Sequence, residues 1–301
     1  MYYQLGSKHK DVKAIQIALE LEPTGFFDVM TQAAVKNFQK KNDLLPSGIV
    51  DPETMELLIK PEISTDLSES VVSLGTDLCI EQYLLPEKEY VTTEGIISKR
   101  DYIFLHHTAG NNDPYQTIRN WATDKRGRIG THFVIGGESR GHNADYDGVV
   151  VQAIPDDYWA YHLGNVNHYM HSHSYSIEIC NYGWLKKEGN DFFNAYGGRM
   201  PSDQVIKLNR PFRGYEYYHR YTDNQIYMVS KLVPYLAEEA EIDIKKGLQF
   251  WINKLGVEHA FEYFTDAVAG KVRGLLSHTN VRTDKTDIYP HPDIVDVIIS
   301  F

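Results

Sequence analysis

The stretch "YIFLHHTAG", residues 102–110, decides how the larger part of this chain folds. Four mostly apolar and aromatic residues precede two histidines, and a small Thr-Ala-Gly segment follows, which predicts a buried strand that ends in a turn. Side chains alternate between the two faces of a strand, so His106 and His107 must point in opposite directions. We expect one of them to be part of a functional site and the other to have a structural role.

Beyond this strand the sequence alternates between strand and helix patterns. Apolar, β-branched stretches at 131–137, 148–154 and 174–180 predict strands, while 113–125 and 222–240 have helical spacing. This order predicts an α/β domain with a mixed central β-sheet flanked by helices. The segment 184–221 is too long for an ordinary loop, so we expect a structured insertion there.

The first part of the chain has a different pattern. Residues 1–62 contain three short amphipathic segments separated by Pro- and Gly-containing turns, which predicts a small three-helix all-α domain. Residues 63–98 are interpreted as a linker, and 99–301 as the α/β domain. We expect no internal repeat.

Composition excludes several classes of protein. A formal net charge of -11 is unsuited to binding nucleic acid, because such binding needs clustered Lys and Arg. No apolar run reaches the roughly 20 residues of a membrane span, and the N-terminus lacks a signal-peptide pattern, so we expect no membrane insertion and synthesis in a cytoplasm. The two cysteines, Cys79 and Cys180, lie far apart without a metal-binding pattern. Any metal site would therefore use His and carboxylate ligands.

A hydrolytic zinc site needs three protein ligands and one open position. The sequence offers His106 at the end of the predicted strand, and His278 with Asp287 in "LSHTNVRTDKTDIYP". On spacing alone this set is weak evidence, because a histidine near a strand end is more often structural.

Two parts of this chain each resemble a known family. Residues 4–59 keep a leucine-glycine start, a TG turn, a T..AV..FQ helix, a G-I-V turn and a final T...L helix, and they resemble the peptidoglycan-binding module of cell-wall hydrolases. Residues 100–292 carry "FLHHTAG", "GTHFVIG", "WAYHLG", "SYSIEICNYG" and "SHTNVRTDKTD" in the order found in zinc-dependent N-acetylmuramoyl-L-alanine amidases. That amidase family includes phage lysozyme-type amidases and animal peptidoglycan recognition proteins.

The resemblance implies a role for each matching residue. It makes His106, His278 and Asp287 the zinc ligands, and it makes Glu178 and Lys285 the catalytic pair. Short phage amidases carry a catalytic tyrosine where this chain has Thr131, so we assign the proton transfer to Glu178, as in the glutamate-type branch. His162 and Thr131 would contact substrate, and His107 would be structural.

The resemblance also implies a function. We expect a zinc enzyme that cleaves the amide bond between N-acetylmuramic acid and L-alanine, with peptidoglycan as its partner. We expect a monomer that waits in a host cytoplasm as a phage endolysin, or is carried as a virion lysin, before it reaches the wall. Two alternatives remain: a recognition module that binds peptidoglycan without cutting it, and a zinc peptidase that acts within the stem peptide.

Overall fold

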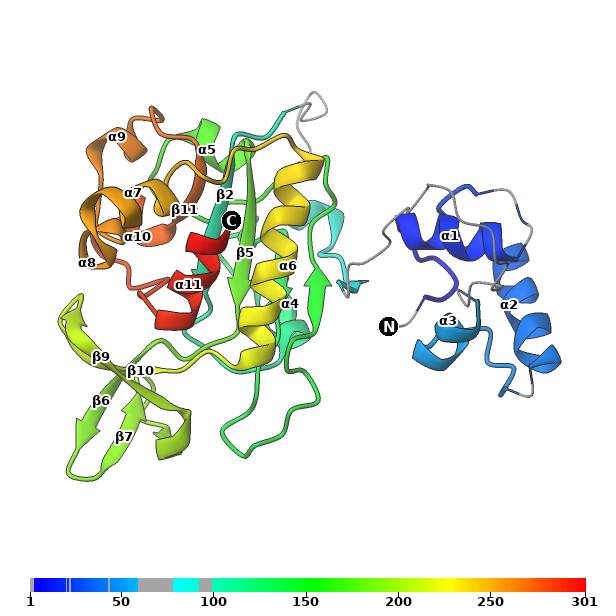
Figure 1. Cartoon of the computed structure of the whole chain (residues 1–301), viewed down its shortest axis with the longest axis horizontal. Helices are drawn as coiled ribbons and strands as arrows, with labels where there is room; N and C mark the ends of the chain where they lie inside the picture. Colours follow the sequence, from blue (N-terminus) through cyan, green and yellow to red (C-terminus); the bar gives the residue numbers. More distant parts are fainter. Residues whose placement is uncertain (1–2, 20, 22, 43, 59–77, 92–98) are drawn as a thin grey trace, which may run out of the picture. The chain divides into compact units, whose positions relative to one another are not determined.

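The computed structural model describes residues 3–19, 21, 23–42, 44–58, 78–91 and 99–301, and the chain forms two units, Met1–Gly75 and Thr76–Phe301 (Figure 1). The fold classes are those predicted: the N-terminal unit is helical, and the second unit is mixed α/β. Of the predicted linker 63–98, residues 63–77 and 92–98 lie outside the described residues. Residues 78–91 pack into the second unit through buried Leu78, Leu85 and Tyr90. We therefore propose that the second domain begins near residue 76.

Three helices form the N-terminal unit: α1 (Lys10–Ala18), α2 (Val29–Lys41) and α3 (Pro52–Leu58). Their apolar faces meet in one small core that includes Val12, Ile15, Phe27, Val35 and Val50. The carboxylate of Asp28 caps α2 by accepting from the Thr31 backbone N–H at 2.7 Å. Small cores of this kind give limited stability, so each buried polar contact matters.

An internal repeat of 23 residues lies within this unit, and our expectation of none is wrong. Gln16 donates to the Thr31 hydroxyl and the Phe26 carbonyl and accepts from the Gly25 N–H. Gln39, 23 positions later, makes the same set of bonds with Thr54, Ile49 and Gly48. Asp51 repeats the cap of Asp28 with the same 2.7 Å distance, here to the N–H of Thr54. The two copies are α1–turn–α2 and α2–turn–α3.

Replacing Gln39 by Ala should destabilise the N-terminal unit by about 2–3 kcal/mol. The change leaves the buried Gly48 N–H and its neighbours without partners, and an unsatisfied buried group costs about 1–3 kcal/mol. Thermal unfolding of this unit, with exposed Asn37→Ala in the same helix as control, measures the difference. Equal melting temperatures for the two variants would show that the glutamine network is not structural.

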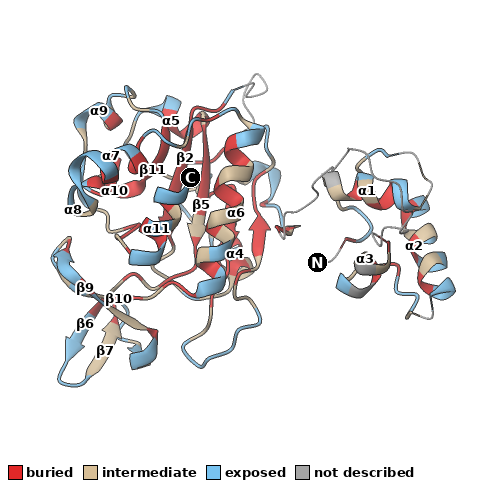
Figure 2. Cartoon of the chain, viewed as in Figure 1, coloured by how far each residue is buried: buried red, intermediate tan, exposed pale blue. Residues whose placement is uncertain are grey.

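A six-stranded sheet forms the centre of the second unit. Its strands are β1 (Ile80–Gln82), β2 (Tyr102–His107), β3 (Phe133–Ile135), β4 (Val150–Gln152), β5 (Ser174–Ile179) and β11 (Gly274–Ser277). Their spatial order is β1-β4-β3-β5-β2-β11, and only the β3–β4 pairing is antiparallel. The predicted mixed sheet is confirmed. Strand β2 is fully buried, which explains why it is nearly continuous in apolar residues (Figure 2).

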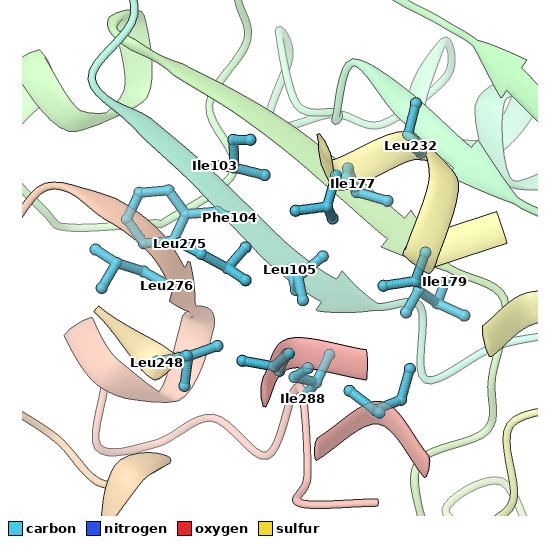
Figure 3. Packing of buried hydrophobic residues seen from close by; sticks show 14 of the residues in the cluster. Ile103, Phe104, Leu105, Ile177, Ile179, Leu232, Leu248, Leu275, Leu276 and Ile288 are labelled. Atoms are coloured by element: carbon cyan, nitrogen blue, oxygen red, sulfur yellow. The ribbon is translucent and has the colours of Figure 1, made fainter. Parts of the chain in front are cut away.

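Helices cover both faces of this sheet. The longer helices of the unit are α4 (Pro114–Trp121), α6 (Asp223–Glu239), α7 (Leu248–Leu255) and α11 (Pro292–Ser300). Its short helices are α5 (His168–Ser172), α8 (Val257–Ala260), α9 (Thr265–Val268) and α10 (His278–Val281), and its 3-10 turns are Glu87–Glu89 and Ser202–Gln204. Leu105 and Ile177 are neighbours in register and pack with Leu232 of α6 on one face (Figure 3). Val134 packs with Ile118 of α4 on the other.

The predicted insertion at 184–221 is a second sheet. It is antiparallel, in the order β8-β7-β6-β10-β9, and consists of β6 (Trp184–Glu188), β7 (Asp191–Asn194), β8 (Arg199–Met200), β9 (Val205–Phe212) and β10 (Tyr215–His219). Most of its side chains are exposed or half-buried (Figure 2). Leu208, Phe212 and Tyr218 join the core of the main sheet, so the second sheet is anchored through β9 and β10.

No helix among the described residues is both long and apolar enough to cross a bilayer.

Acid should destabilise the second unit through its buried histidines. Burial, with the nearby Arg220 charge, lowers the pKa of His219 to about 3, and burial lowers that of His291 to about 4. Below pH 6.5 these two histidines therefore bind protons in the unfolded chain but not in the folded chain. The free energy of unfolding falls as the pH drops from 6.5 towards these pKa values. Each histidine contributes a slope of up to about 1.4 kcal/mol per pH unit.

Denaturant unfolding at pH 7.5, 6 and 5 measures this slope. In His219→Gln the slope should be shallower, because glutamine does not take up a proton in this pH range. The fold should be kept, since the amide oxygen can still accept the Tyr182 N–H bond that His219 Nδ1 accepts at 3.1 Å. An identical slope in the wild type and the variant would contradict this assignment.

Candidate metal centre

Two neighbouring parallel strands bring the candidate ligands together. β11 pairs with β2 so that Ser277 lies beside Leu105, which places His278 next to His106 at the carboxyl ends of both strands. After α10 the chain returns to the same place and brings Asp287 there. The Asp287 carbonyl accepts the Thr279 N–H at 3.1 Å. Residues 181 positions apart in sequence thus share one buried site, as is common at the carboxyl ends of parallel strands.

The three side chains form a nearly equilateral triangle of ligand atoms. His106 Nδ1 lies 3.1 Å from His278 Nδ1 and 3.2 Å from Asp287 Oδ2, and His278 Nδ1 lies 2.9 Å from the same oxygen. Tetrahedral Zn²⁺ with bonds of about 2.0–2.1 Å separates its ligand atoms by about 3.3 Å. The spacing of these three atoms therefore fits a zinc ion.

Hydrogen bonds alone do not account for this triangle. If both imidazoles donated from Nδ1 to Asp287, their two N–H groups would face each other across the 3.1 Å separation. A cation at the centre would satisfy all three atoms at once. Of the residues that the structure describes, these three are the group of His, Cys, Asp and Glu whose ligand atoms converge in this way.

The protonation states also suit a cation. Burial lowers the pKa of His106 to about 4, so its imidazole is neutral at pH 7. Burial by itself would raise the pKa of Asp287, but the electrostatic and polar interactions with His278 and His106 hold it well below its ordinary value. Metal ligands must be deprotonated, and the lowered pKa values of His106 and Asp287 meet that condition.

Glu178 and Lys285 line the same cavity as the three candidate ligands, and its volume is about 650 Å³. Glu178 lies beside His106 in the register of β5 with β2, on the same face of the sheet. Burial and the Asp287 charge raise its pKa well above the ordinary value, which Lys285 partly opposes. A carboxyl group with a raised pKa suits proton transfer near neutral pH.

His107 lies on the opposite face of β2 from His106, as strand alternation predicts. Its ring is buried, and its Nδ1 lies 3.0 Å from the Tyr221 hydroxyl. It packs 6.1 Å from the ring of Tyr289, although an edge of it also reaches the cavity wall. Its side chain therefore belongs mainly to the packing with Tyr221 and Tyr289.

The two predicted substrate contacts differ in position. His162 lines the cavity, where its Nδ1 lies 3.0 Å from His106 Nε2 and its Nε2 lies 2.8 Å from the Ser174 hydroxyl. Thr131 is buried, is not among the residues that line the cavity, and donates its hydroxyl proton to the Phe133 carbonyl at 3.0 Å. The structure thus brings His162 to the candidate site and leaves Thr131 within the core.

Sequence reasoning missed several cavity residues. The cavity is also lined by Arg126, Tyr161, Tyr196 and Arg282. Tyr196 comes from the second sheet, and its side chain is 77% exposed. Tyr161 and Arg282 lie inside the motifs "WAYHLG" and "SHTNVRTDKTD", which could have pointed to them. No local pattern marks Arg126 and Tyr196, because each lies on a loop whose path depends on the whole fold.

Comparison with known proteins identifies the two parts of the chain. Residues 98–295 match the family model for N-acetylmuramoyl-L-alanine amidase, and residues 8–58 match that for a peptidoglycan binding domain. A search of curated proteins finds no match.

Solved structures similar to this chain include an N-acetylmuramoyl-L-alanine amidase LysC from Clostridium intestinale, with 16% identity, a TM-score of 0.38, and coverage of 74% of this chain and 96% of that one. A mutant endolysin from Bacillus subtilis has 18% identity, a TM-score of 0.34, and coverage of 56% and 80%. The amidase AmiD from E. coli has 17% identity, a TM-score of 0.32, and coverage of 53% and 55%. Because the amidase model spans more than half of the 301 residues, this chain belongs to the N-acetylmuramoyl-L-alanine amidase family.

Proposed function

We propose that this peptidoglycan amidase is zinc-dependent, that His106, His278 and Asp287 hold the ion, and that Glu178 and Lys285 carry the reaction. The observation that carries the proposal is the triangle of ligand atoms, with sides of 2.9, 3.1 and 3.2 Å, in one cavity with a carboxyl group and an amine. The bond cleaved would be the amide between the lactyl group of N-acetylmuramic acid and L-alanine.

Zinc held by three ligands supplies a Lewis acid that polarises a carbonyl and makes water acidic near neutral pH. Glu178 takes the proton from the attacking water and delivers it to the amide nitrogen as the C–N bond breaks, which yields a carboxylic acid on the sugar and a free amine on L-alanine. The Lys285 ammonium faces the same cavity and stabilises the negative charge that develops on the carbonyl oxygen.

His162 has a supporting part in this proposal. Its bond to His106 Nε2 holds the ring so that Nδ1 remains directed at the other two ligands. Metal-binding histidines commonly make such a bond from their second nitrogen, which fixes the orientation and tautomer of the ring.

The N-terminal unit would hold the enzyme on its substrate. A peptidoglycan binding domain joined to an amidase keeps the catalytic unit near the wall, and this raises the local substrate concentration even when the domain binds weakly. A wall-binding unit and a lytic unit in one chain are the parts that a phage endolysin or virion lysin needs, and we propose that role for this protein.

Cleavage of intact sacculi tests the proposal. The purified chain should release peptides with free L-alanine N-termini from otherwise intact glycan. A chelator should abolish this release, Zn²⁺ should restore it, and His106→Ala should remain inactive with added zinc. Cuts within the peptide would instead identify a zinc peptidase, and binding without cleavage would identify a recognition protein.

A further inference from the structure

The tip of one hairpin in the second sheet has an unusual residue. Strands β9 and β10 are joined by a two-residue turn, Arg213–Gly214, in which φ is 50° and 87°. Such turns need positive φ at both positions and strongly favour Asn-Gly, because a longer side chain is strained in this conformation. Arginine at the first position therefore strains the backbone locally. Backbone strain of this kind indicates that the residue makes stabilising contacts elsewhere.

The Arg213 side chain makes these stabilising contacts. Its guanidinium donates to the Thr283 carbonyl at 3.1 Å and to the Thr279 carbonyl at 3.2 Å, with the Glu262 carboxylate 3.6 Å away. The side chain is only 15% exposed. A planar guanidinium can bridge two acceptors at fixed separation, which the single ammonium of lysine cannot do in the same way.

Both acceptors belong to the segment that carries the candidate ligands. Thr279 directly follows His278, its N–H donates to the Asp287 carbonyl at 3.1 Å, and Thr283 precedes Lys285 by two residues. The Thr279 carbonyl is one of those that the short helix α10 leaves without an intrahelical partner. Arg213 thus joins the start of this segment to its middle.

We propose that Arg213 is a positioning residue for the metal centre: the hairpin of the second sheet fixes segment 278–287 so that His278 and Asp287 keep the spacing that a metal ion requires. This inference rests on the proposed zinc function and assigns a task to the inserted sheet. It also explains why this turn has arginine in place of the preferred asparagine.

Arg213→Asn separates positioning from folding. It creates the preferred Asn-Gly turn, so the melting temperature of the metal-free protein should stay the same or rise. Zinc affinity, measured by competition with a chromophoric chelator, should weaken about tenfold, as for other outer partners of metal ligands. The visible spectrum of the Co²⁺-substituted protein should also change, because the ligand geometry changes.

Two further variants complete the test. Arg213→Lys keeps the charge and should recover only part of the affinity. Arg210→Asn removes an exposed arginine of β9, three residues before Arg213 and bonded to Glu258 at 2.6 Å, and should leave zinc affinity and spectrum unchanged. Wild-type affinity and spectrum in Arg213→Asn would overturn the inference, as would a loss of affinity matched by a drop in metal-free stability. If the wild type itself binds no zinc, the proposed function fails instead.

Discussion

Glu178→Gln is expected to lower kcat on sacculi by about 10²- to 10⁴-fold, the range that a positioned acid–base group contributes. Glutamine keeps the size of the side chain but can neither accept the proton of the attacking water nor return it to the leaving amine. Glu178 lies beside His106 in the sheet and lines the cavity, but it is not one of the three converging ligands. Zinc content should therefore remain that of the wild type.

Initial rates at saturating sacculi, measured on protein of known zinc content, provide the readout. Glu188→Gln, an exposed carboxylate of β6, is the matched control and should keep full activity. A Glu178→Gln enzyme within a few-fold of the wild-type kcat would show that the proton travels by another route.

Asp287→Asn should weaken zinc binding by more than about a hundredfold, because it removes the one anionic ligand and even outer-sphere partners are worth 10- to 100-fold. The carboxylate lies within 3.2 Å of both histidine Nδ1 atoms, so the amide would stay in place but supply no charge. Activity at limiting zinc should fall with the affinity.

Chelator competition measures this loss directly. Asp284→Asn serves as control, because Asp284 lies three residues earlier and is bonded to Arg282 with 59% of its side chain exposed. Comparable affinity in the two variants would remove Asp287 from the ligand set.

The part of the fold that local patterns determine could be predicted from the sequence. The apolar run at 102–105 indicated a buried strand, and strand alternation separated His106 from His107. Helices α4 and α6 begin within a residue of their predicted starts, at Asp113 and Thr222, whose side chains cap them. In these elements local propensity and tertiary packing favour the same structure.

Other features depended on contacts between distant segments. Residues 80–82 looked like part of a linker, yet they pair with β4 as an edge strand, because three residues carry too little periodicity to be recognised. The bond between His162 and His106 joins residues 56 positions apart. The site residues themselves are assigned by resemblance, since spacing alone does not distinguish His106 and His278 from the rest of the thirteen histidines.

The repeat in the N-terminal unit keeps identical residues where side chains make its hydrogen bonds and differs at many of the other positions. Gln16 and Gln39 match, as do Asp28 and Asp51, but Phe26 corresponds to Ile49, whose contribution is a backbone carbonyl. A carbonyl acceptor places no demand on the side chain, so the hydrogen-bond pattern is kept while the sequence diverges.

The shared helix of that repeat makes its two copies inseparable. Helix α2 carries Thr31, which closes the first glutamine network, and Gln39, which opens the second. Neither half can be removed without taking the other's hydrogen-bond partner with it. The smallest cooperative piece of this unit is therefore both copies together, and we expect it to unfold in a single all-or-none transition.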